Sequence, residues 1–149
     1  NAGLATEDGL DFYGGQLTYT ADSYGASVTY ANLDLGTAWG LNGYYSFASD
    51  LPSVSVGYEF AEEDGTEIES TQWFVGLQWD ELGNGTLGVA LGSRGPQIED
   101  AEEDMAYELF YTYNVNDSMT ITPAIFILED NDAGDDDTTG VVVKTSFSF

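Results

Sequence analysis

Thr139-Gly-Val-Val-Val-Lys-Thr-Ser-Phe-Ser-Phe149 is the stretch of the chain that decides its fold class. Successive side chains of an extended strand point to opposite faces. The apolar side chains then share one face: Val141, Val143, Phe147 and Phe149. Small and polar side chains share the other: Gly140, Lys144, Ser146 and Ser148. Outer-membrane barrels turn such an apolar face to lipid. The stretch is therefore typical of a membrane strand, although soluble strands alternate as well.

The composition predicts one all-β domain over residues 1–149. Aromatic residues make up 14% of the chain, with 18 Gly and only 3 Pro. Tyr, Trp, Phe, Thr and Val suit pleated strands. Residues 1–10 show no periodicity and are predicted to be loop. No stretch reaches the roughly 18 apolar residues of a membrane helix. Because the chain opens on Asn1, we expect a processed amino-terminus or a piece of a longer chain.

The charged and reactive residues exclude several classes of function. The net charge of −25 comes from 27 acidic and 2 basic residues, which argues against a nucleic-acid partner because phosphate binding needs Lys and Arg. Neither Cys nor His is present, so thiolate sites, Ser-His-Asp triads and ordinary zinc sites cannot form. We therefore expect no cofactor and no enzymatic activity.

Alternation of apolar and polar residues recurs along the whole chain. Segments near ten residues long fit tilted membrane strands joined as successive hairpins. Pro123 interrupts one of them, because Pro cannot donate to a sheet ladder. About nine strands of an antiparallel transmembrane β-barrel are predicted, at residues 11–20, 23–32, 37–48, 53–60, 72–79, 87–94, 105–113, 119–127 and 139–149.

Two features separate a membrane barrel from a soluble β-sandwich binding module, which is an alternative. Short turns at 21–23, 49–52, 80–85 and 114–117 are predicted to lie on one side, and long acidic loops at 61–70, 95–104 and 129–138 on the other. Aromatic residues of the apolar face gather at both strand ends, as at two membrane interfaces. The predicted aromatic girdle includes Trp39, Trp73, Trp79, Tyr107, Tyr113 and Phe149.

Parts of the chain resemble a known family. Asn114-Val-Asn-Asp-Ser-Met-Thr-Ile-Thr-Pro123, an Asp-rich loop, and Thr139–Phe149 are similar to the carboxy-terminal end of cyanobacterial outer-membrane porins of the carbohydrate-selective porin (OprB-like) superfamily. Thr71–Asp80 resembles the marine members. The resemblance implies a barrel of about 16 strands, of which this chain is a carboxy-terminal part. It also implies a homotrimer in the cell outer membrane, and we expect insertion by the barrel-assembly machinery through the terminal strand.

The expected function is passive diffusion of small hydrophilic solutes and ions through a water-filled lumen. The polar face would line this lumen, with Lys144 and Glu108 at similar height. The candidate pore-lining residues are Lys144, Glu108, Arg94, Glu59, Gln72, Gln78 and Asn42. Their charges would tune ion selectivity, or would only avoid contact with lipid. A small barrel that acts as adhesin or structural anchor is the alternative function.

The acidic loops permit three interpretations. Solvated surface charge is the default, and rejection of anions at the pore mouth is another. Hard divalent cations bind clustered carboxylates, so a metal site is a weak third interpretation. Its candidate ligands are Asp130, Asp132, Asp135, Asp136 and Asp137.

Overall fold

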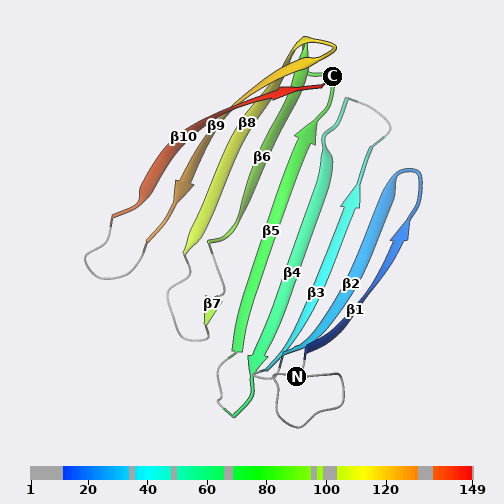
Figure 1. Ribbon diagram of the computed structural model, residues 1–149, viewed down its shortest axis with the longest axis vertical. Coiled ribbons are helices and arrows are strands. Elements are labelled where there is room, and N and C mark those ends of the chain that lie inside the picture. Colours follow the sequence, from blue (N-terminus) through cyan, green and yellow to red (C-terminus); the bar gives the residue numbers. More distant parts are fainter. Residues whose placement is uncertain are drawn as a thin grey trace, which may run out of the picture.

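The computed structural model describes residues 12–33, 36–47, 50–65, 69–94, 97–98, 104–130 and 136–148. These residues form a single antiparallel β-sheet (Figure 1). Its strands are β1 (Phe12–Thr20), β2 (Tyr24–Leu33), β3 (Gly36–Tyr45), β4 (Ser53–Glu63), β5 (Glu69–Trp79), β6 (Gly85–Ser93), β7 (Gln97–Ile98), β8 (Met105–Asn116), β9 (Met119–Leu128) and β10 (Thr138–Phe147).

The strands follow one another as a meander. Their order in the sheet is β1-β2-β3-β4-β5-β6-β8-β9-β10, and the short β7 pairs with β5 beside this path. The prediction of about nine long antiparallel strands is confirmed within the described residues. β1 and β10 are the two edges of the sheet, and the described residues do not pair them with each other.

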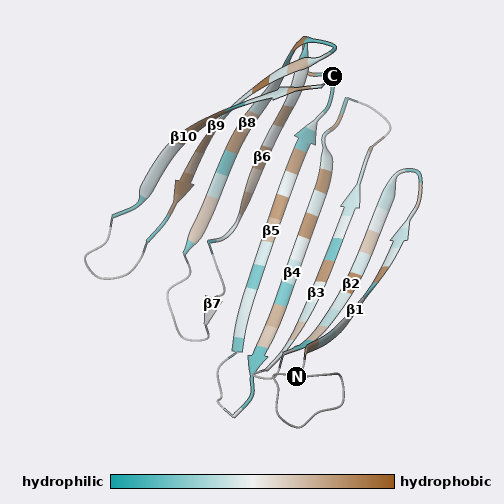
Figure 2. Cartoon of the chain, in the orientation of Figure 1, coloured by the Kyte–Doolittle hydropathy of each residue, from teal (hydrophilic) through white to brown (hydrophobic). Residues whose placement is uncertain are grey.

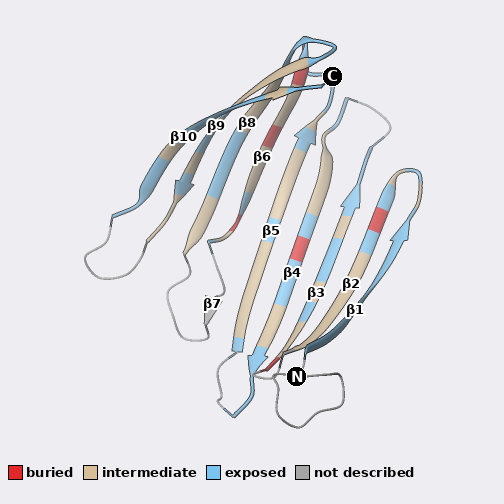
Figure 3. Cartoon of the chain, in the orientation of Figure 1, coloured by how far each residue is buried: buried red, intermediate tan, exposed pale blue. Residues whose placement is uncertain are grey.

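This sheet has no hydrophobic core. No apolar side chain of the described residues is buried. The buried residues of the described chain are all glycines: Gly25, Gly36, Gly57, Gly85, Gly88 and Gly92. Buried strand positions stand out in red on β2, β4 and β6 in Figure 3. A soluble sandwich would bury the inner faces of two packed sheets. The sandwich alternative is therefore wrong.

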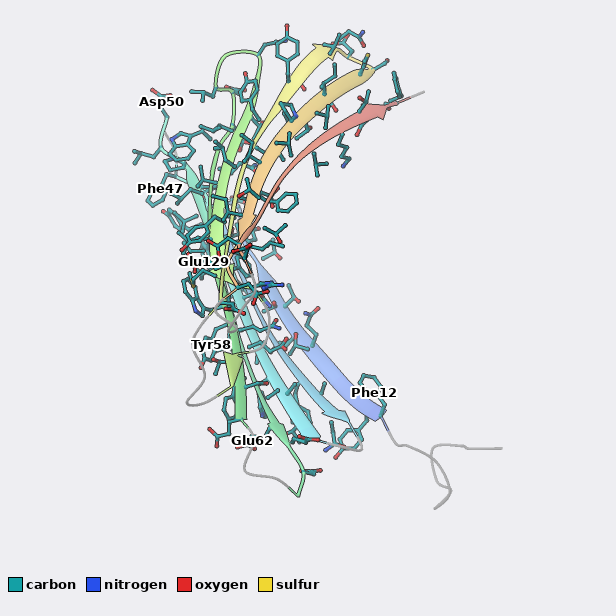
Figure 4. The ribbon with its side chains drawn as sticks, turned by 90° about the vertical axis from the view of Figure 1, so that its left-hand side faces the viewer. Phe12, Phe47, Asp50, Tyr58, Glu62 and Glu129 are labelled. Carbon is teal, nitrogen blue, oxygen red and sulfur yellow. The ribbon has the colours of Figure 1, made fainter. Side chains whose placement is uncertain are left out.

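The single layer is bent, and its two faces differ chemically. Seen edge-on in Figure 4, the sheet is an arc, and Phe47 and Tyr58 project from its convex side. Tyr58 shares its face with large apolar residues of the neighbouring strands, namely Leu41 and Trp73 across the register. Bands of opposite hydropathy alternate along β3, β4 and β5 (Figure 2). The convex face is thus apolar, and the concave face carries the small and polar residues.

Two connections differ in length from the sequence-based expectation. β4 continues to Glu63 and β5 begins at Glu69, so the predicted loop at 61–70 shrinks to a connection at 64–68. Glu62 lies directly opposite Glu69. On the other side β3 already ends at Tyr45, which lengthens the predicted 49–52 turn to 46–52. The lengths of turns and loops therefore alternate less regularly than predicted.

Pro123 is accommodated inside β9. Toward β10 it lies opposite Val143, so this ladder continues through it. Toward β8 the ladder has a gap between the pairs Phe110–Ala124 and Tyr113–Ile121. The missing N–H of Pro explains the gap. The hydroxyl oxygens of Thr112 and Thr122, 3.0 Å apart, form a hydrogen bond that bridges it.

Several predicted features lie outside the described residues, namely the loop at 1–10, most of 95–104, Asp132, Asp135 and Phe149. The described part of the chain holds no apolar helix of membrane-spanning length.

Candidate functional site

The concave face is lined by residues that the register places side by side. Gln16 lies opposite Thr29 and donates a 2.9 Å hydrogen bond to its hydroxyl. Ser27 lies opposite Asn42, and Asn42 lies opposite Gly57. Small and hydroxyl side chains leave the backbone close to the surface and present hydrogen-bonding groups to water. This part of the concave face is a wall of small and hydrogen-bonding side chains.

Three of the predicted pore-lining residues come together on β3, β4 and β5. Asn42, Glu59 and Gln72 line one shallow groove of about 230 Å³. Glu59 lies between Gly40 on β3 and Gln72 on β5. Its carboxylate is exposed, which is consistent with a charge that remains in water.

Two further predicted residues line a larger groove of about 680 Å³ across β5, β6, β8, β9 and β10. Glu108 and Lys144 both border it. Lys144 lies opposite Thr122, whereas Glu108 lies opposite Phe126, which in turn faces Gly140. Glu108 is therefore four register positions from Lys144, about 13 Å along the strands. The expectation of similar height is corrected by this register. Lys144 forms no ion pair with the described residues.

Gln78 sits at the turn end of β5 rather than in the middle of the wall. Its side-chain amide donates a 2.9 Å hydrogen bond to Oδ1 of Asp80. It also borders a groove of about 400 Å³ together with Asp50 and Phe47. Gln78 is thus placed at the short-turn rim.

Arg94 lies just beyond β6, at the loop end of the sheet. Its Nη1 is 2.5 Å from Oδ2 of Asp130 and donates a 2.8 Å hydrogen bond to the carbonyl of Glu129. Its backbone N–H donates a 2.8 Å hydrogen bond to the carbonyl of Asp104. One arginine therefore joins the end of β6 to the segments before β8 and after β9. Its charge is partly compensated by Asp130, so it contributes less field to a lumen than an unpaired arginine would.

The Asp-rich segment is only partly described. The backbone N–H of Asp130 donates a 3.2 Å hydrogen bond to Oδ1 of Asp137. Asp130, Asp136 and Asp137 are the described members of the predicted metal-ligand set. Within the described ranges no group of three or more potential ligands is close enough to hold a metal ion.

Aromatic residues of the convex face lie at both ends of the strands. At the loop end the ring centroids of Tyr30 and Trp39 are 4.6 Å apart, and Tyr13 follows at 6.4 Å from Tyr30. At the turn end those of Tyr45 and Phe47 are 4.7 Å apart. The remaining described members of the predicted girdle are also on this face. Tyr107 lies near the start of β8, and Trp79 and Tyr113 lie toward the turns. Trp73 lies four residues inside β5, opposite Tyr58, because β5 begins earlier than predicted, at Glu69.

Among the bulky side chains of the concave face that were not predicted as site residues are four aromatic residues within the strands. Tyr44 is on β3, Phe74 on β5, Phe110 on β8 and Phe126 on β9. Phe74, Phe110 and Phe126 form the apolar floor of the larger groove. The sequence did contain a signal for these four residues. Each aromatic residue stands at a position of its strand where the alternation predicts a small or polar side chain.

Comparisons with known proteins add a family. The family described as Gram-negative porin matches residues 1–132 of the chain. No match is found among curated proteins or solved structures.

Proposed function

Because the chain belongs to the Gram-negative porin family, we propose that its sheet forms part of the wall of an outer-membrane pore, with the concave face toward water. The protein is a porin for passive diffusion of small hydrophilic solutes, and it is not an enzyme. The direction of bending supports this placement of the faces. A sheet that curves around its polar side and exposes Leu41, Val56 and Leu109 on the outside fits a water-filled lumen surrounded by lipid.

The strand count bears on how such a wall closes. In an antiparallel path of nine described strands, β1 and β10 run in the same direction. Direct pairing of these edges would be parallel, whereas bacterial outer-membrane barrels are antiparallel with even strand numbers. Closure then takes an odd number of further strands. This parity favours a larger barrel with an even number of strands, and the resemblance to the cyanobacterial porins suggests about 16.

The finer assignments rest on the resemblance to cyanobacterial carbohydrate-selective porins. They comprise sugars among the solutes, a cyanobacterial outer membrane and a homotrimer. Insertion by the barrel-assembly machinery is inferred instead from the terminal strand and its aromatic last residue. The aromatic residues at both strand ends would lie at the two membrane interfaces. Asn42, Glu59, Gln72, Glu108 and Lys144 would line the lumen, with Gln78 and Arg94 at its two rims.

Ion selectivity tests the lumenal position of Lys144. Replacing Lys144 by Glu exchanges a positive charge for a negative charge on the wall of the larger groove. We expect a clear shift of the permeability ratio toward cations with little loss of folded protein, because the side chain lies on the hydrated face. The measurement is the reversal potential of single channels in a planar bilayer across a salt gradient.

Thr122→Glu adds a negative charge on β9, directly opposite Lys144. This second variant should shift selectivity in the same direction as Lys144→Glu. An unchanged reversal potential in both variants would mean that these residues do not face the conduction path. Wild-type protein that inserts but conducts no ions would instead favour the anchor or adhesin function.

The orientation of the wall is tested by labelling on intact cells. Asp64 lies in the β4–β5 connection and Asp50 in the β3–β4 connection, at opposite ends of the sheet. We expect Asp64→Cys to react with a membrane-impermeant maleimide and Asp50→Cys to react only after the outer membrane is permeabilised. If only Asp50→Cys reacts on intact cells, the orientation of the sheet in the membrane is the opposite of the proposed one.

A further inference from the structure

Tyr44, Phe74, Phe110 and Phe126 of the concave face each lie directly opposite a glycine. The cross-strand pairs are Gly25–Tyr44, Gly57–Phe74, Gly88–Phe110 and Gly140–Phe126. They involve eight different positions on β2 to β6 and β8 to β10. Alternation of apolar and polar residues along a strand does not by itself produce this pairing, which depends on the register between strands.

The rings occupy the space that a side chain at the glycine would need. A Cβ at Gly57 would lie 2.7 Å from Cδ1 of Phe74, and one at Gly88 would lie 2.9 Å from Cδ1 of Phe110. At Gly140 it would lie 2.6 Å from Cε1 of Phe126. Each ring therefore leans sideways over the backbone of the neighbouring strand.

The tyrosine pair repeats the arrangement on the other half of the sheet. A Cβ at Gly25 would lie 3.0 Å from Cζ and 3.2 Å from the hydroxyl oxygen of Tyr44. Gly25, Gly57 and Gly88 are buried although the sheet has no core. The ring on the opposite strand accounts for this burial, because it covers the glycine from the concave side.

Side chains of a strand usually stand roughly perpendicular to the sheet. An upright aromatic ring on the concave face would extend into the lumen. We propose that the four glycines are positioning residues that hold the rings flat against the wall and so keep the pore open. This inference rests on the proposed porin function, and it adds a determinant of pore width to it.

The rings would still contact solutes in their flat position. Those of Phe74, Phe110 and Phe126 border the groove that also holds Glu108 and Lys144. A solute that passes along this wall meets flat aromatic surface between two opposite charges. The glycines thus determine both the free width and the chemical character of this part of the lumen.

Alanine substitution tests the proposal in the full polypeptide. In the triple variant Gly57→Ala, Gly88→Ala and Gly140→Ala, each methyl group takes the space of a ring and turns it toward the lumen. We expect single-channel conductance in a planar bilayer to fall on the order of twofold, because the conducting cross-section narrows. Heat-modifiable migration on gels reports the folded fraction of each variant.

Gly40→Ala is the matched control. Gly40 also lies on the concave face, but a Cβ there would meet only Cβ of Thr29 at 3.7 Å, an ordinary contact. Its conductance should equal that of the wild type. Adding Phe74→Ala, Phe110→Ala and Phe126→Ala to the triple glycine variant should restore conductance, because no ring remains to obstruct the lumen.

The possible outcomes separate this inference from the porin function itself. If the wild type conducts and the folded triple glycine variant has the same conductance, this inference is wrong, while the porin function stands. If that variant does not fold, the three Phe→Ala substitutions are made with the glycines intact. Flat rings predict nearly unchanged conductance in that case, whereas a large increase would show that the rings already stand in the lumen and would overturn the proposal.

Discussion

Replacing Leu41 by Arg should lower the free energy of unfolding by about 2–4 kcal/mol, because a guanidinium would face lipid near the middle of the wall. Leu41 is on the convex face, 55% exposed, between Val28 and Tyr58 on the neighbouring strands. No packed core explains a large loss there, since its side chain has few neighbours to lose. Denaturant unfolding of the protein in lipid vesicles, followed by tryptophan fluorescence, gives the measurement.

Asn42→Arg provides the matched comparison. Asn42 is the next residue of β3 and belongs to the concave face, where it borders a groove with Glu59 and Gln72. The same arginine would there remain in water near a carboxylate, so we expect a change below about 1 kcal/mol. Equal losses for the two variants would show that lipid does not cover the convex face.

The two faces of the sheet were predictable from the chain because the side-chain period of a strand is two. Val141, Val143 and Lys144 take the sides that the terminal stretch predicts. The prediction also extends across the sheet, since neighbouring hairpins keep residues of one face in register. Leu41, Tyr58 and Trp73 meet in this way although they come from three strands.

Strand ends were less predictable because the acidic residues there are compatible with both loop and strand. Glu62 and Glu69 face each other at the end of the β4–β5 hairpin. Like charges opposite each other are unfavourable. Both glutamates are exposed, so water screens the repulsion, and the backbone ladder can continue past them. Because acidic residues suggested a loop, the sequence predicted β4 and β5 too short and the connection between them too long.

Contacts between residues that are distant in sequence could not be predicted without the structure. Arg94 and Asp130 are 36 residues apart, and the pair forms only because β6 and β9 both flank β8. The glycine–aromatic pairs have the same origin. An aromatic residue at position 110 is visible in the sequence, but its position opposite Gly88 depends on the register of two strands. Pairwise contacts of this kind determine the details of the candidate lumen.

The terminal strand β10 forms one edge of the sheet and leads to the aromatic last residue of the chain. β10 is an edge strand whose described residues pair with β9 alone, and it carries an apolar convex face of Val141, Val143 and Phe147. Its last described residue is still attached to the sheet, since the backbone N–H of Ser148 donates a 2.9 Å hydrogen bond to the carbonyl of Ser118. Phe149 directly follows this anchored position.

Deleting Phe149 should therefore remove more than half of the protein that reaches the folded, membrane-inserted state. The physical reason is that the aromatic end of an edge strand is an apolar element that the assembly machinery can bind by strand pairing. Asp136→Ala, at an exposed position just before β10, is the control and should insert normally. Heat-modifiable migration of outer-membrane fractions measures both variants. Equal insertion would show that the terminal aromatic residue is not an assembly signal, and recognition would then have to depend on the alternating face of β10 as a whole.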